Sequence, residues 1–143
     1  MMKYLAKAAA IALALVLTAG SAASAADATK KHHVIFHVTE DDPVKWNQTL
    51  NNAGNLQSAV GKGNVEIEIV ANGPGLNMMK FESSVANRMS DAMGNGVSIL
   101  ACGATMKAAK LTEKDLFPGV KVVPGGVVQI MNRQEAGWTY IKN

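Results

Sequence analysis

Val97-Ser-Ile-Leu-Ala-Cys-Gly-Ala-Thr-Met-Lys107 is the stretch that decides how this chain folds. Its apolar run over 97–101 predicts a buried strand, and the residues after Gly103 predict the first turn of a helix. Cys102, the only cysteine of the 143 residues, lies between the two. A strand-to-helix turn is where α/β proteins place reactive groups. The thiol of Cys102 is therefore the first candidate for chemistry.

Strands and helices alternate on both sides of this stretch. Runs rich in β-branched residues predict five strands, over residues 32–39, 65–71, 97–101, 120–123 and 138–141. Apolar periodicity predicts helices over residues 43–60, 78–93 and 124–135, with a short helix after Gly103. This alternation is typical of a parallel sheet that helices cover on both faces. We therefore expect a three-layer α/β/α fold with a five-stranded, mainly parallel sheet.

Two of the helical segments carry more specific predictions. The helix over 78–93 is expected to turn four apolar residues at helical spacing toward the core: Phe81, Val85, Met89 and Met93. Thr112 and Asp115 have the spacing of a capping box, which predicts a brief helical turn between Leu111 and Leu116.

Four short segments are expected to meet at one edge of the sheet, because ligands of parallel sheets gather beyond the carboxyl ends of the strands. They are Glu40-Asp-Asp42, Asn72-Gly-Pro-Gly75, Cys102-Gly103 and Pro124-Gly-Gly126. The predicted ligand-binding residues at this edge are Asp41, Asn72, Gly73, Gly103, Gly125 and Gly126.

Cys102 has two interpretations. At a helix N-terminus it would face the positive end of the helix dipole and unpaired N–H groups, which lower a thiol pKa from about 8.5. Gly103 leaves room beside the sulfur, and Lys107 would add positive charge if its side chain folded back. Cys102 and Lys107 are therefore the predicted catalytic pair. The other interpretation is a small buried filler, since free cysteine is among the most buried residue types.

Other site classes have little support. His33 and His37 lie four residues apart on a strand, about 13 Å, too far to chelate one ion together, and we predict no metal site. Gly125 and Gly126 either cradle an anion at a helix start or form a tight turn. Neither a G-x-G-x-x-G nor a Walker pattern surrounds them, so no cofactor is predicted.

Residues 1–25 resemble a secretory signal peptide. Lys3 and Lys7 precede an apolar core over 8–19, and Ala23-Ser-Ala25 matches an A-x-A cleavage site. This core is about a dozen residues long, short of the roughly 20 that span a bilayer. We expect cleavage near Ala26 and export to a periplasm without stable membrane insertion; an uncleaved anchor is the alternative.

The remaining residues, 26–143, are expected to form a single domain. The full chain has 14 Lys and Arg against 11 Asp and Glu. Removing Lys3 and Lys7 leaves 12 against 11, a net charge of about +1. The remaining lysines form no cluster, which argues against nucleic-acid binding.

The second half of the chain resembles the DsrE/DsrF-like family, which includes sulfur-relay subunits of the Dsr and Tus systems and YchN. The similarity is carried by Gly96–Lys107, Leu111–Val120 and Val123–Ile130, with Gln134–Tyr140 typical of an exported branch. The resemblance implies a five-stranded parallel sheet in three layers and assembly into trimers or hexamers.

The resemblance also implies a role for the thiol. In sulfur-relay members, a cysteine at the end of the third strand carries a persulfide, and Cys102 matches that position. Lys107 stands where an arginine is common. This chain departs from the relay members in two ways. The relay members act in the cytoplasm, whereas this chain is expected to be exported. This chain also has no second cysteine to receive the sulfur.

The leading hypothesis is thus an exported sulfur carrier, or sulfurtransferase-like protein, that holds sulfane sulfur on Cys102. Its partners would be copies of itself and a sulfur donor or acceptor, either a protein or a small sulfur compound. The alternative is a non-catalytic oligomeric module that binds a small ligand or a protein at the same edge, with a structural cysteine.

Overall fold

A computed structural model describes residues 31–143, and the predicted signal peptide over 1–25 lies outside them. One sheet of five strands, all paired in parallel, runs in the order β4-β3-β2-β1-β5. The strands are β1 (His32–Val38), β2 (Val65–Ala71), β3 (Ser98–Cys102), β4 (Lys121–Val123) and β5 (Thr139–Lys142). All five predicted strands are therefore present, with ends shifted by a residue or so.

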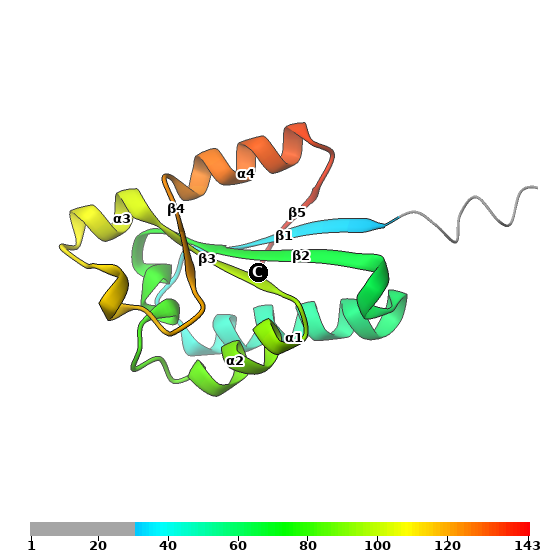
Figure 1. The fold of residues 1–143 in the computed structure, drawn as a ribbon, viewed down its shortest axis with the longest axis horizontal. Helices are drawn as coiled ribbons and strands as arrows, with labels where there is room; N and C mark the ends of the chain where they lie inside the picture. The colour runs from blue at the N-terminus through cyan, green and yellow to red at the C-terminus, as the bar shows by residue number, and fades with distance from the viewer. Residues whose placement is uncertain (1–30) are drawn as a thin grey trace, which may run out of the picture.

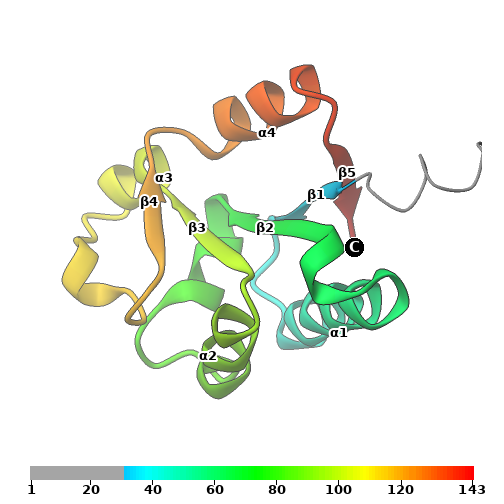
Figure 2. The ribbon, with the colours of Figure 1, turned by 45° about the vertical axis from the view of Figure 1, so that its right-hand side comes forward.

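Helices lie on both faces of this sheet. They are α1 (Pro43–Val60), α2 (Ala86–Gly94), α3 (Gly103–Ala108) and α4 (Gly126–Glu135). Short 3-10 helices are η1 (Lys62–Asn64), η2 (Gly73–Met79) and η3 (Glu113–Asp115). Figure 1 shows α1 and α2 on one face, α4 on the other and α3 at one end of the sheet, an arrangement that persists in the turned view of Figure 2. The predicted three-layer α/β/α class is confirmed.

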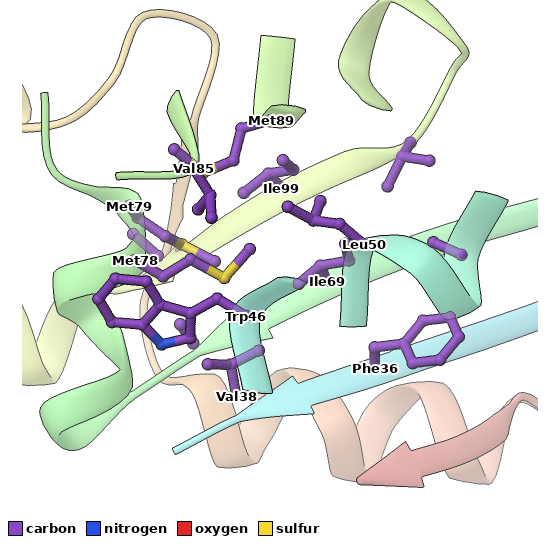
Figure 3. Close-up of a cluster of buried hydrophobic side chains, with 14 of the residues drawn as sticks. Phe36, Val38, Trp46, Leu50, Ile69, Met78, Met79, Val85, Met89 and Ile99 are labelled. Atoms are coloured by element: carbon purple, nitrogen blue, oxygen red, sulfur yellow. The ribbon is translucent and has the colours of Figure 1, made fainter. Parts of the chain in front are cut away.

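The face under α1 and α2 carries the larger core. Alternate strand residues such as Phe36, Ile69 and Ile99 point into it and are at most 1% exposed. Trp46 and Leu50 of α1 pack against them, together with the methionines of η2 and α2 (Figure 3). This layer holds the sheet rigid, so the strand ends at the candidate edge are fixed in position.

Helix α1 follows its predicted bounds for local reasons. Asp42 caps it by accepting a hydrogen bond of 2.8 Å from the backbone N–H of Val44. Pro43 occupies the first turn, where its missing N–H costs no hydrogen bond. Gly61, with a φ of 89°, ends the helix in a conformation that favours glycine.

The predicted helix over 78–93 is wrong in its first half. The chain first forms η2, where Gly75 packs so closely on β1 that a Cβ there would lie 2.4 Å from the Val38 carbonyl oxygen. It then bends, and the N–H of Phe81 donates to the Asp115 carbonyl. Phe81 is consequently 63% exposed, whereas Val85 and Met89 are buried as expected.

The helical turn predicted between Leu111 and Leu116 is η3. The predicted capping box of Thr112 and Asp115 is confirmed at η3. Among the helices of residues 31–143, none combines the length and apolar character needed to cross a bilayer.

Candidate functional site

Cys102 is the last residue of β3 and the N-cap of α3. Its side chain shares the α4 face of the sheet with Leu100, and the residue is 5% exposed. Two helices begin beside it, because α3 follows directly and α4 starts at Gly126. The predicted strand-to-helix turn is thus present at Cys102, and the first turn of α4 packs against it.

Gly126 makes the closest contact with the sulfur. Its backbone N–H donates a hydrogen bond of 3.1 Å to Cys102 Sγ. A Cβ at Gly126 would lie 3.3 Å from the Cβ atoms of both Asn72 and Cys102. The absence of a side chain at Gly126 is what allows α4 to begin this close to the thiol.

Thr105, in the first turn of α3, supplies a second polar contact. Its hydroxyl oxygen accepts a hydrogen bond of 3.0 Å from the backbone N–H of Gly73. A hydrogen bond from this hydroxyl also lowers the pKa of the Cys102 thiol. Thr105 was not a predicted site residue, although a hydroxyl residue three positions after a helix-capping cysteine is a detectable signal.

These contacts set the electrostatics of the thiol. Burial alone raises the pKa of Cys102, but hydrogen bonds from the Thr105 hydroxyl and from the backbone N–H groups of Gly126 and Thr105 outweigh it. The net result is a pKa below the ordinary value, because the donors favour the charged form. The geometry therefore favours a thiolate in a largely buried position.

A second hydrogen-bond chain ends beside the thiol. Nε2 of His37 lies 2.7 Å from Oδ1 of Asn72, and Nδ1 of His37 lies 2.9 Å from the Tyr140 hydroxyl. With Oδ1 as the acceptor, Nε2 donates, and Nδ1 accepts from Tyr140. The chain fixes the side chain of Asn72, which packs against Gly126. Neither His37 nor Tyr140 was a predicted site residue.

The chain as a whole matches a known protein family. The chain matches the model of the DsrE/DsrF-like family over residues 5–142. The chain belongs to the DsrE/DsrF-like family. Members of this family are associated with sulfur relay. None of the curated proteins matches the chain.

Solved structures agree with the assignment to the DsrE/DsrF-like family. A protein of unknown function, MTH1491 from Methanobacterium thermoautotrophicum, is 35% identical, with a TM-score of 0.76 over 79% of this chain and 100% of that one. The ychN protein from E. coli is 10% identical, with a TM-score of 0.64 over 80% and 99% of the two chains. Protein BT1422 from Bacteroides thetaiotaomicron is 15% identical, with a TM-score of 0.64 over 78% and 94%. The last two show similarity of fold alone.

The glycines predicted at the edge of this DsrE-like domain lie around the thiol. Gly73 donates to Thr105, and Gly126 donates to Cys102. Gly103 passes so close to β4 that a Cβ would lie 2.9 Å from the Val123 carbonyl oxygen. Gly125 is the N-cap of α4. Four predicted positions thus form the backbone of one site.

Two other predicted residues lie away from the sulfur. Asp41 Oδ2 accepts a hydrogen bond of 2.7 Å from Asn77 Nδ2, which ties Asp41 to η2. Lys107 lies in the last turn of α3 with an exposed side chain, and it is not among the groups that lower the Cys102 pKa. The role predicted for each stays a prediction.

A groove of about 390 Å³ lies between η2 and α3, on the other side of Thr105. Gly73 and Thr105 contribute to its wall, and Lys80 supplies its positive charge. Thr105 thus borders this groove and also acts on the thiol.

His33 and His37 are engaged in local contacts. The His33 ring lies 5.1 Å from the Trp138 ring and its Nε2 lies 3.6 Å from Glu66, while His37 binds Asn72 and Tyr140. Within residues 31–143, no three His, Cys, Asp or Glu side chains come together in a group that would hold a metal ion.

Proposed function

We propose that this DsrE-like protein carries sulfane sulfur as a persulfide on Cys102. The observation that carries the proposal is the position of Sγ between two helix starts: Cys102 is the N-cap of α3, and the Gly126 N–H at the start of α4 donates to Sγ at 3.1 Å, with the pKa of the thiol lowered. A thiolate is the nucleophilic form of cysteine. Membership of a family associated with sulfur relay supports the same chemistry.

The loading step is a nucleophilic displacement at sulfur. The Cys102 thiolate attacks the outer sulfur of a donor persulfide, R–S–SH, and forms the new S–S bond. The donor S–S bond breaks with its electron pair, releasing the thiolate RS⁻ and leaving Cys102–S–SH. With thiosulfate as donor, the leaving group is sulfite. Neither version needs an external oxidant, because the transferred sulfur keeps its oxidation state.

Delivery reverses this step. An acceptor thiolate attacks the outer sulfur of the Cys102 persulfide, and the Cys102 thiolate leaves. The donors that lower its pKa also make it a better leaving group. Since the chain has a single cysteine, the acceptor is a partner protein or a small sulfur compound.

The competing function is that of a non-catalytic binding module, and the 5% exposure of Cys102 favours it. A buried thiol that only fills space would neither ionise readily nor react. The groove between η2 and α3 would then take a ligand independently of the sulfur.

Intact mass spectrometry separates the two functions. Residues 26–143 are incubated with thiosulfate or with polysulfide and weighed without reduction. The carrier function predicts a gain of one sulfur atom, about 32 Da, that dithiothreitol removes and that Cys102→Ser lacks. Thr112→Ser, which removes a methyl group at the N-cap of η3, is the control and should load like the parent. Failure of the folded parent to gain mass from either donor would favour the binding module.

We also propose that residues 1–25 are a cleaved signal peptide and that 26–143 are the periplasmic domain. Lys3, Lys7, the apolar core and the Ala23-Ser-Ala25 motif support this. The mass of the protein recovered from a periplasmic extract tests it. A chain beginning near Ala26 is expected, and an intact Met1 in the cytosolic fraction would contradict it.

Self-assembly is the third part of the proposal, in the trimers or hexamers typical of the family. The outer side of α4 is apolar, with Val127 63%, Val128 54% and Met131 49% exposed, and exposed apolar patches mark association surfaces. Sedimentation velocity should show an oligomer that Val128→Lys dissociates. Val44→Lys, at a 74% exposed residue on the opposite layer, is the control. A monomeric parent would overturn this part.

A further inference from the structure

Glu68 is the one charged side chain that is buried within residues 31–143, at 5% exposure. It lies on β2, on the face that α4 covers, and it is no part of the thiol chemistry described above. A buried carboxylate costs free energy unless charge and hydrogen bonds compensate it. Its partners therefore indicate what it holds in place.

Both carboxylate oxygens of Glu68 are bound by α4. Arg133 Nε lies 3.0 Å from each oxygen, and Arg133 Nη2 also donates to Oε1. Gln129 Nε2 donates to Oε2 at 2.9 Å. The guanidinium carbon lies 4.5 Å from the centre of the Trp138 ring, which keeps the arginine flat against the sheet.

These contacts matter because α4 has few others. Of its ten residues, Gly126 and Ile130 are the buried ones. Gly126, Gln129, Ile130 and Arg133 share the sheet-facing side of the helix by their spacing. The helix is thus attached by a glycine at its start, one isoleucine in its middle and the Glu68 ion pair near its end.

The two attachment points lie at opposite ends of the same helix. Seven residues separate Gly126 from Arg133, about 10 Å along the axis. On the sheet, Asn72 beside the thiol is four residues beyond Glu68, about 13 Å along β2. Because these spans are comparable, the ion pair restrains both the tilt and the slide of α4 over the sheet.

We propose that Glu68 is a positioning residue for Cys102: by holding Arg133 and Gln129, it keeps the first N–H of α4 directed at Sγ. This inference rests on the proposed sulfur-carrier function, because that function requires a stabilised Cys102 thiolate. If the ion pair is removed, α4 shifts, and the Gly126 donor moves away from the sulfur. The thiolate then loses a stabilising hydrogen bond although no residue touching it has changed.

The test titrates the thiolate absorbance of Cys102 in Glu68→Gln, which retains the shape of the side chain and removes its charge. Loss of one charge-assisted hydrogen bond is expected to raise the titration midpoint by about one pH unit. Arg133→Lys keeps the charge but loses the two-pronged contact, and should shift the midpoint less, in the same direction. It also serves if Glu68→Gln does not fold.

Two controls separate positioning from general destabilisation. Glu66→Gln removes a neighbouring carboxylate of the same strand and face, which acts on Arg133 by charge alone and not by a hydrogen bond, and should move the midpoint much less than Glu68→Gln. Ile67→Val weakens the opposite core and should lower the melting temperature without moving the midpoint. An unchanged midpoint in folded Glu68→Gln and Arg133→Lys, or an equal shift in Ile67→Val, would overturn the inference.

The outcome is independent of the sulfur-carrier proposal. If the midpoint shifts as expected but the parent never gains sulfur, Glu68 positions a thiol with another role. If the parent gains sulfur and the midpoint is the same in all variants, the carrier function stands and the positioning role is wrong.

Discussion

The face of the sheet under α1 and α2 contributes to a core of twenty buried apolar residues, whereas the core under α4 has five, beside a buried carboxylate and the thiol. The first face is continuous and mostly apolar, with Thr49 and Gln57 of α1 as its buried polar side chains, and burial of apolar surface is how a sheet gains most of its stability. The second is small and polar, and its helix is attached at a few points. We infer that one face maintains the fold and the other carries the chemistry.

The largest expected effect is on the first face. Phe36→Ala removes a ring that is 1% exposed and should lower the free energy of unfolding by about 3–5 kcal/mol. The thiolate titration should not change in the molecules that stay folded, because the ring points away from α4. Urea unfolding and the titration together check this. A shift of the Cys102 midpoint would show that the two faces are coupled.

Gly126→Ala should have a smaller effect on stability and a direct one on the thiol. The new methyl group would lie 3.3 Å from the Cβ atoms of Asn72 and Cys102, so α4 must move outward by a few tenths of an ångström. We expect a loss of about 1–3 kcal/mol and a higher titration midpoint.

Gly125→Ala is the matched control for that substitution. Its methyl group would meet only the exposed side chain of Val128, at 3.4 Å, and the φ of −149° suits any residue. Stability and midpoint should both stay close to the parent. If Gly125→Ala and Gly126→Ala shift the midpoint equally, close packing of α4 on the sulfur is not what matters.

Thr105→Val removes one hydroxyl from the second face at nearly constant volume. Cys102 loses a donor, and the N–H of Gly73 loses its acceptor. We expect a loss of about 1 kcal/mol in stability and a rise of about one pH unit in the midpoint. Thr105→Ser retains the hydroxyl and should titrate like the parent; a shift in Ser equal to that in Val would assign the effect to the methyl group.

The smallest expected effect is a pH dependence of stability. The folded-state pKa of Cys102 is lowered, so between that pKa and the unfolded value of about 8.5 the unfolded chain binds more protons. Stability therefore rises with pH across this window and is lost as the pH falls through the folded pKa. Compared with Cys102→Ala, the parent should gain free energy of unfolding between neutral pH and pH about 9. An equal pH dependence in both proteins would contradict a lowered pKa.

Features that depend on local sequence could be predicted, whereas those that depend on tertiary contacts could not. Runs of β-branched residues predict strands such as 65–71, and the place of Cys102 between an apolar strand and a glycine indicates the site. The failure at Phe81 has a tertiary cause, since its N–H bonds to the distant Asp115 carbonyl in a segment that is helical by apolar spacing alone.

The composition of the site was harder to predict for the same reason. Thr105 is near Cys102 in sequence, but its role depends on Gly73, 32 residues away. His37 and Tyr140 are 103 residues apart and meet only because β1 pairs with β5. The alternation of polar and apolar residues in β2 predicts that Glu68 faces solvent, and only the position of α4 shows that it is buried.

The thiolate titration of the unmodified domain tests the central claim most directly. Because Cys102 is the only cysteine, the ultraviolet absorbance that Cys102→Ser lacks belongs to this one sulfur. The donors from α3, α4 and Thr105 predict a midpoint clearly below the ordinary value of about 8.5. A midpoint at or above that value would mean that burial dominates and that Cys102 is a filler of the smaller core.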